Sequence, residues 1–158
     1  MRVGVGYDSH RFEAGRSLIL GGVRIPAERG LAGHSDADAL AHAITDALLG
    51  AAGLGDLGTH FPPTAAKWAG ADSLGLLAAA LLMLEERNYQ VVNIDATVVC
   101  EPVRLAPHAS AMRDRLAEIV GISPAHVSVK VKSNEGMGWV GRGEGIAVVA
   151  VALIDAIE

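Results

Sequence analysis

Two glycines occupy alternate positions in the first apolar segment of the chain. The segment Arg2–Tyr7 predicts a β-strand, and Gly4 and Gly6 share one face of it because successive residues of a strand point to opposite faces. Glycine inside a strand often marks a place where another backbone or a ligand approaches closely. We therefore expect a fold in which something packs tightly on this face of the first strand.

Predicted strands and helices alternate along the rest of the chain. The strands are Leu18–Leu20 and Val23–Ile25, which Gly21 and Gly22 join as a hairpin, then 91–100, 127–131 and 145–154; the helices are 35–52, 72–87 and 108–120. Ser35 or Asp36 caps the first helix and Gly53 ends it, and residues 54–71 form a loop rich in Gly and Pro. Asp72 or Ser73 caps the second helix, and Gly121 ends the third. This order predicts one α/β domain over residues 1–158, with helices packed on one face of a mixed sheet.

Hydrophobic residues make up 51% of the 158 residues. The longest apolar stretches, Leu76–Leu84 and Ile146–Ile154, are too short to span a bilayer as helices. A domain of this size has a limited interior, so the surplus is expected to cover an interface between subunits. The chain does not begin with a basic segment followed by an apolar one, and neither a secretion signal nor a transit peptide is expected.

Charge and cysteine content restrict the partners and the compartment. A net charge of −5 without any basic run disfavours nucleic acid as a partner. Cys100 is the only cysteine, which excludes an internal disulfide and fits a reducing compartment such as the cytoplasm.

Three potential metal ligands are Asp8, His10 and His42. Asp8 and His10 lie two residues apart at the end of the first predicted strand and so point to one face, while His42 lies on the first predicted helix. Two imidazoles and one carboxylate are a typical ligand set for a catalytic zinc with one open position. The alternative is a surface aspartate beside a half-buried histidine. Asp38 and Asp46 share the helical face of His42, where they either orient its ring or are simple surface charges.

Two further segments have features of a phosphate or hydroxyl site. His34 and Ser35 lie at the start of the first predicted helix, where free N–H groups and the helix dipole favour an anion, although Ser35 is alternatively only a cap. The glycines of Gly55–Gly58 allow close approach of a ligand to the backbone. Within that segment Asp56 either accepts hydrogen bonds from substrate hydroxyls or occupies its usual place in a turn.

Two polar segments follow in the C-terminal third. Ser133 and Glu135 come after a predicted strand and combine a hydroxyl with an acid, a pair that suits phosphate and a hard cation such as Mg²⁺; the alternative is a polar loop. Arg142 and Glu144 alternate between glycines and predict either an ion pair, repeated around a symmetry axis, or a catalytic role.

Together these segments indicate phosphoryl chemistry. They supply zinc ligands, a phosphate cradle and a second cation site, whereas the chain contains neither a Gly-X-Ser-X-Gly nucleophile motif nor a P-loop. Metals would then position an oxygen nucleophile that belongs to the substrate or to water.

Five motifs resemble one known family. They are Gly6–Phe12, Gly33–Asp38, Thr45–Gly50, Gly55–Gly58 and Gly141–Gly145. Their order and spacing are similar to those of 2-C-methyl-D-erythritol 2,4-cyclodiphosphate synthases over nearly the whole chain. The resemblance implies a phosphorus-oxygen lyase of the non-mevalonate isoprenoid pathway, which converts 4-diphosphocytidyl-2-C-methyl-D-erythritol 2-phosphate to the cyclic diphosphate and releases CMP. It also implies a ferredoxin-like sandwich that assembles as a homotrimer, with active sites between subunits, in the cytoplasm or in a plant plastid.

The resemblance assigns roles to individual residues. It implies that Asp8, His10 and His42 bind one Zn²⁺ per subunit, and that Glu135 holds Mg²⁺ or Mn²⁺ between the α- and β-phosphates. The expected catalytic residues are these four together with His34 and Ser133. The expected substrate-binding residues are His34 and Ser35 near the phosphates, Asp56 and Gly58 near the methylerythritol, and Cys100, Glu101, Pro102, Val103, Arg104, Leu105, Ala106, Val131, Lys132, Ser133, Trp139 and Arg142. Arg142 and Glu144 also match residues near a central trimer cavity, which in some family members holds isoprenoid diphosphates.

Three segments depart from the family pattern. Pro63 and Ala65 stand where many relatives have acids after Phe-Pro that contact the erythritol hydroxyls. Pro102 lies one position from the usual proline of the cytidine loop, and Lys132 begins a segment that replaces a Thr-rich run, although Ser133 keeps a hydroxyl. None of these changes affects a predicted metal ligand.

Two other classes of function are considered. A metal-dependent phosphohydrolase of a nucleotide-diphosphate substrate would use water as the nucleophile and form an open phosphate, so its product distinguishes it from the synthase. A trimeric binder of isoprenoid diphosphates without activity would keep Arg142 and Glu144 but would have no use for an open zinc site.

Overall fold

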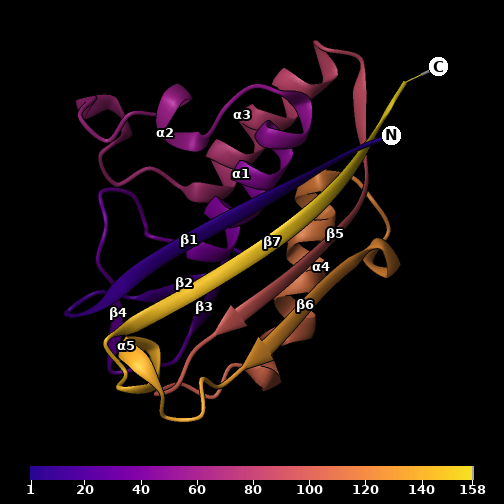
Figure 1. Ribbon diagram of the computed structural model, residues 1–158. Helices are drawn as coiled ribbons and strands as arrows, with labels where there is room; N and C mark the ends of the chain where they lie inside the picture. The colour runs from indigo at the N-terminus through magenta and orange to yellow at the C-terminus, as the bar shows by residue number, and fades with distance from the viewer. Residues whose placement is uncertain (158) are drawn as a thin grey trace.

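Five strands form the main sheet, in the order β4-β1-β7-β5-β6 (Figure 1). They are β1 (Arg2–Ala14), β4 (Arg29–Leu31), β5 (Tyr89–Val99), β6 (Val127–Lys132) and β7 (Gly145–Ala156), and a separate hairpin joins β2 (Leu18–Leu20) to β3 (Val23–Ile25). Neighbouring strands are antiparallel except β5 and β6. The computed structural model describes residues 1–157.

Three long helices lie on one side of the sheet (Figure 1). They are α1 (Ala39–Ala52), α3 (Ser73–Glu85) and α4 (Ala109–Val120), accompanied by the short helices α2 (Leu57–His60) and α5 (Gly138–Gly141) and by the 3₁₀ turns η1 (Ala66–Trp68), η2 (Ala106–His108) and η3 (Pro124–His126). The mixed α/β sheet with helices on one face is therefore confirmed. Within residues 1–157, no helix is both long and apolar enough to cross a membrane.

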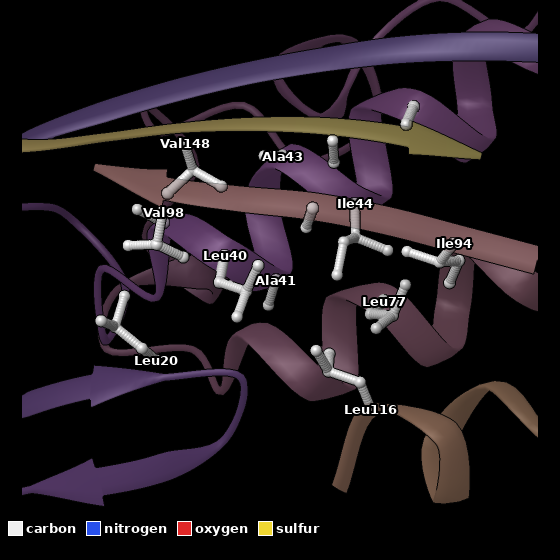
Figure 2. Close-up of a cluster of buried hydrophobic side chains, with 14 of the residues drawn as sticks. Leu20, Leu40, Ala41, Ala43, Ile44, Leu77, Ile94, Val98, Leu116 and Val148 are labelled. Carbon is white, nitrogen blue, oxygen red and sulfur yellow. The ribbon is translucent and has the colours of Figure 1, made fainter. Parts of the chain in front are cut away.

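The core lies between the sheet and these helices (Figure 2). Alternate residues of β7, from Ile146 to Ile154, are fully buried, whereas Val149 and Val151 between them are exposed. The buried side chains labelled in Figure 2 come from strands and helices alike: Leu20, Leu40, Ala41, Ala43, Ile44, Leu77, Ile94, Val98, Leu116 and Val148. One face of the sheet is thus covered by helices and the other carries exposed apolar residues.

The alternate glycines of β1 explain how closely α1 packs on the sheet. A Cβ atom added to Gly6 would lie 1.9 Å from the carbonyl oxygen of Ala43, and one added to Gly4 would lie 2.0 Å from that of Ala47. Both carbonyls belong to α1, so backbone lies directly on backbone here, as the sequence pattern predicted. Asp8 and His10 continue the same face of β1 and therefore point toward the helix that carries His42.

The expectation of a ferredoxin-like arrangement is wrong. Without the short strand β4 and the short helices, the main sheet reads along the chain as β1, helices α1 and α3, β5, helix α4, β6 and β7, which is β-α-β-α-β-β. The ferredoxin-like order is β-α-β-β-α-β. The physical reason is the parallel pairing of β5 with β6, which requires α4 as a crossover connection. β7 then lies between β1 and β5 rather than beside β6.

Several predicted boundaries also change. β1 runs on to Ala14 because it pairs with β7 as far as Arg11 and with β4 from Phe12 to Ala14. α1 begins at Ala39, and its N-cap is Asp38 rather than Ser35 or Asp36. β4, α2 and α5 were not predicted, since each has only three or four residues and no periodicity to detect. Gly53 and Gly121 end their helices in the left-handed conformation, as predicted.

Candidate functional site

Asp8, His10 and His42 meet where β1 packs on α1. One carboxylate oxygen of Asp8, Oδ2, lies 2.9 Å from Nε2 of His10 and 3.0 Å from Nδ1 of His42. Asp8 and His10 are partly buried and His42 is buried. Among residues 1–157 this is the only group of three or more His, Cys, Asp or Glu side chains whose possible ligand atoms all lie within 4.8 Å of one another.

The hydrogen bonding of His10 determines which of its ring nitrogens faces Asp8 as an electron-pair donor. Nδ1 of His10 lies 2.5 Å from the carbonyl oxygen of Ala32. A carbonyl only accepts, so Nδ1 carries the hydrogen. In a neutral ring Nε2 then presents its lone pair to Asp8.

A chain of hydrogen bonds gives His42 the opposite tautomer. Oγ of Ser73 is buried, donates to the carboxylate of Asp36 and lies 2.8 Å from Nε2 of His42. A hydroxyl has a single hydrogen, so toward His42 Oγ of Ser73 accepts and Nε2 donates. Nδ1 of His42 therefore presents its lone pair to Asp8. Oγ of Ser35 lies 3.3 Å from the same Nε2.

This arrangement fits a divalent cation. Two ring lone pairs and a carboxylate oxygen converge with no hydrogen between them, which is unfavourable unless a proton or a metal ion lies there. Burial lowers the pKa of His10, but its hydrogen bond to Asp8 and the charge of Asp8 raise it above the ordinary value of 6.5. Burial raises the pKa of Asp8, but the hydrogen bonds and charges of the two histidines bring it below its ordinary 3.8. The pKa shifts of Asp8 and of His10 both favour a positive charge between these two side chains.

Neither Asp38 nor Asp46 orients the ring of His42, contrary to one of the two interpretations of the sequence. Both oxygens of Asp38 are bound elsewhere, to the backbone N–H groups of Gly21 and Gly22 and to that of Ala41 in α1. Complete burial raises the pKa of Asp38 to about 6, against the lowering effect of these three donors. Asp46 accepts from the N–H of Leu57 at 2.7 Å and so holds the start of α2. Both carboxylates attach neighbouring segments to α1.

The residues expected near the phosphates precede α1 and those expected near the methylerythritol follow it, and among them Ser35 contacts His42. His34 is exposed, and its carbonyl accepts from the N–H of Gly70 at 2.8 Å, which holds the loop 61–71 next to residues 34–36. Asp56 caps α2 and accepts from both N and Oγ1 of Thr59, at 2.8 and 2.7 Å. Asp56 is thus the cap of a short helix, with its carboxylate exposed, and Gly58 is an exposed residue of the same helix.

A second polar cluster lies where β5 and β6 end. The carboxylate of Glu101 accepts from the backbone N–H groups of Asn134 at 2.8 Å and of Gly136 at 3.3 Å. Ser133 donates from Oγ to Glu135 Oε1 at 3.2 Å. The N–H of Cys100 donates to the carbonyl of Lys132 and keeps these two segments side by side. No hydrogen bond or ion pair found within residues 1–157 joins this cluster to the His10–His42 centre.

The other residues of the expected cytidine loop fall into two groups. Cys100 and Leu105 are buried, whereas Pro102 and Arg104 are exposed. Val103 lines a cavity of about 350 Å³ with Pro102 and Arg104. Ala106 is the first residue of η2, and Val131 and Lys132 are the last two residues of β6. This loop is open to solvent on the side of Pro102 and Arg104.

Trp139, Arg142 and Glu144 lie around the start of β7. Trp139 and Glu144 line an open cavity of about 570 Å³ together with His10. Nε of Arg142 donates to Glu144 Oε1 at 2.8 Å, and both side chains are exposed. The ion pair that the glycine-flanked motif predicted is therefore present.

Sequence reasoning missed Ser73 as the partner of His42 and Asp36 as the partner of Ser73. Ser73 was predicted only as one of two possible caps of α3, and the structure shows that Asp72 is that cap. Asp36 was predicted as a possible cap of α1 but instead accepts from both N and Oγ of Ser73. No spacing rule relates positions 36, 42 and 73, so only the packing of α3 against α1 reveals the contact.

Comparison with known proteins gives a consistent result. Residues 1–155 match the YgbB family. A 2-C-methyl-D-erythritol 2,4-cyclodiphosphate synthase from Symbiobacterium thermophilum is 58% identical over 154 residues, which are 98% of this chain and 98% of that protein. A solved structure of a 2C-methyl-D-erythritol-2,4-cyclodiphosphate synthase in a CDP-bound form superposes with a TM-score of 0.90 at 37% identity, covering 98% of this chain and 100% of the other. The bifunctional IspDF of Campylobacter jejuni superposes with a TM-score of 0.96 at 38% identity; 99% of this chain is covered, but only 42% of that longer one.

Proposed function

This chain belongs to the YgbB family, and from that membership we infer the reaction that the centre of Asp8, His10 and His42 serves. The chain has the activity of the 2-C-methyl-D-erythritol 2,4-cyclodiphosphate synthases, lyases of isoprenoid biosynthesis. We propose that it acts as one catalytic domain over residues 1–158. Its proposed substrate is 4-diphosphocytidyl-2-C-methyl-D-erythritol 2-phosphate, and CMP is the second product.

The convergence of three electron-pair donors on one point is the observation that carries the proposal. Two imidazoles and a carboxylate match the preference of Zn²⁺ and leave one position open for a substrate oxygen. We propose zinc for this site, where it acts as a Lewis acid on the β-phosphate. Ser73 with Asp36 and the carbonyl of Ala32 hold the two rings in the tautomers that binding requires.

The side chains around this centre position the substrate and stabilise its charge, because the substrate carries its own nucleophile. An oxygen of its 2-phosphate attacks the β-phosphorus in line, a ring closes and CMP leaves. Ser73 does not compete as a nucleophile, since its hydroxyl is fully buried and already donates to Asp36. His34 and Ser35 are proposed to bind phosphate oxygens, and Asp56 with Gly58 to bind the methylerythritol. Positioning and electrostatic stabilisation are the main sources of rate in phosphoryl transfer.

A second divalent cation, Mg²⁺ or Mn²⁺, is proposed at Glu135. Mg²⁺ keeps several waters and takes one or two carboxylates together with substrate phosphates, so a single exposed carboxylate beside Ser133 suits it. When bound there, the cation would offset the negative charge of the α- and β-phosphates. Backbone groups of residues 100–106 and 131–133 are proposed to bind the base and ribose, with Trp139 and Arg142 nearby. A CDP-bound form among the similar structures supports this pocket.

The exposed face of the sheet supports a trimer. Val3, Val5 and Tyr7 of β1 lie opposite Leu153, Val151 and Val149 of β7, and all but Leu153 are at least 37% exposed. Such a continuous apolar patch is unusual on a monomer and typical of a subunit interface. We propose a homotrimer with the active sites between subunits. Arg142 and Glu144 are then proposed to lie near a central cavity that takes an isoprenoid diphosphate.

We also propose a cytoplasmic location, which the free thiol of Cys100 supports.

Phosphorus NMR of the products tests the reaction. The enzyme is incubated with the cytidine diphosphate substrate, with and without a chelator. We expect a cyclic diphosphate and CMP, and no turnover after zinc is removed. An open-chain phosphate product would instead indicate the alternative function, a metal-dependent phosphohydrolase.

The variant His42→Ala tests the assignment of the metal centre. It should keep the circular dichroism of the folded chain but lose both zinc and turnover. Full zinc content together with normal CMP release would refute the role of His42.

A further inference from the structure

The turn that carries Glu135 has an unusual backbone. Glu135 has a φ of 51° and Gly136 a φ of 71°. Glu135 is one of three non-glycine residues with positive φ in the part of the chain that the structure describes, 1–157. The left-handed conformation is unfavourable for a residue with a Cβ atom, so the surrounding structure has to hold Glu135 in place.

The side chain of Glu101 supplies this support. Its Oε2 accepts from the N–H of Asn134 at 2.8 Å and its Oε1 from the N–H of Gly136 at 3.3 Å. The two donors flank Glu135 on either side. Backbone N–H groups that converge in a turn form an anion-binding concavity, and here a carboxylate from the same chain fills it.

Further contacts keep the rest of the turn in place. Nδ2 of Asn134 donates to the carbonyl of Met137 at 2.8 Å. A Cβ atom on Gly141 would lie 2.2 Å from the carbonyl carbon of Gly136, so the backbone of α5 packs directly against the turn. With its backbone held from both sides, Glu135 presents an exposed carboxylate whose one protein partner here is Ser133.

We propose that Glu101 is a positioning residue for the second divalent cation, and that its carboxylate binds the enzyme's own backbone instead of the substrate. By holding Asn134 and Gly136, it places the carboxylate of Glu135 where the cation meets the phosphates. The inference rests on the proposed role of Glu135.

Manganese binding to the zinc-loaded enzyme, saturated with CDP, tests this role. Free Mn²⁺ is measured by electron paramagnetic resonance, and CDP affinity by calorimetry. Loss of two charge-assisted hydrogen bonds in Glu101→Ala should weaken Mn²⁺ binding by about tenfold or more, while zinc content and CDP affinity stay within about threefold. Glu101→Gln keeps one acceptor oxygen but turns its NH2 group toward the other backbone N–H, so it should recover only part of the Mn²⁺ affinity. Glu85→Ala, which removes an exposed charge from the end of α3, is the matched control and should change nothing.

The outcomes separate this inference from the assignment on which it rests. Weak Mn²⁺ binding in both Glu135→Ala and Glu101→Ala, with partial recovery in Glu101→Gln, supports it. Equal losses in Glu101→Gln and Glu101→Ala would mean that the acceptor oxygen that Gln keeps does not support the turn, and would overturn the inference. Normal Mn²⁺ binding in Glu101→Ala would also overturn it, provided that Glu135→Ala is impaired. If Glu135→Ala binds Mn²⁺ normally, the proposed role of Glu135 fails first.

Discussion

Replacing Gly6 with alanine should damage the fold and the metal centre together. The new Cβ atom would lie 1.9 Å from the carbonyl oxygen of Ala43 and 2.7 Å from the backbone nitrogen of Ala47. These are helix backbone atoms, which cannot rotate aside. To restore a van der Waals separation of about 3.5 Å, α1 would have to retreat from β1 by about 1.5 Å.

Such a shift is large compared with the tolerance of a packed core. A gap of about 0.5–1 Å already removes a quarter to a half of the dispersion energy of each contact. Overpacking usually costs about 1–3 kcal/mol, and we expect the upper end of that range or more, because backbone faces backbone on both sides. Zinc affinity should also fall at least about tenfold, since β1 carries Asp8 and His10 while α1 carries His42.

Urea unfolding followed by circular dichroism gives the stability, at one fixed protein concentration and with excess chelator, so that subunit association and zinc do not alter the comparison. Zinc content is then measured separately without chelator. Gly50→Ala is the matched control: it lies on α1, no atom lies within 4 Å of the added Cβ, and it should gain about 0.5–1 kcal/mol from helix propensity. Gly6→Ala with wild-type stability and full zinc would refute the reasoning.

Three further changes test the site and the assembly. Ser73→Ala leaves Nε2 of His42 without its buried partner, so zinc affinity should fall about 10–100-fold in competition with a chromogenic chelator. An unchanged affinity would rule out a role for Ser73 in orienting His42. Zinc should be released as the pH falls: burial lowers the pKa of His10, but the hydrogen bond and charge of Asp8 together with the carbonyl of Ala32 raise it above 6.5, so protons compete for the same nitrogen; a chelator titration that shows full retention at pH 4 would contradict this. Val5→Asp should dissociate the proposed trimer in analytical ultracentrifugation while Val5→Thr preserves it, and a charged variant that stays trimeric would exclude this face of the sheet as the interface.

Local patterns determined much of the fold and of the metal centre. The alternate glycines of β1 indicated a close backbone contact, and i, i+2 spacing placed Asp8 and His10 on the same face as those glycines. The glycines that end α1 and α4 could be predicted because few residue types other than glycine adopt the left-handed conformation that ends a helix. The motifs of the YgbB family were also local, since each lies within a few consecutive residues. In every such case, neighbours in sequence carry the information.

Tertiary structure decided everything that depends on segments distant in sequence. The position of β7 between β1 and β5, and the parallel pairing that α4 makes possible, overturned the expected ferredoxin-like order. The contact of His42 with Ser73 joins residues 31 positions apart, and that of Glu101 with Asn134 joins residues 33 apart. Periodicity describes which face a residue occupies, but which partner meets that face depends on how whole elements pack. The sequence by itself therefore indicated the activity and the three side chains that converge, and only packing decided which side chains orient the two histidine rings.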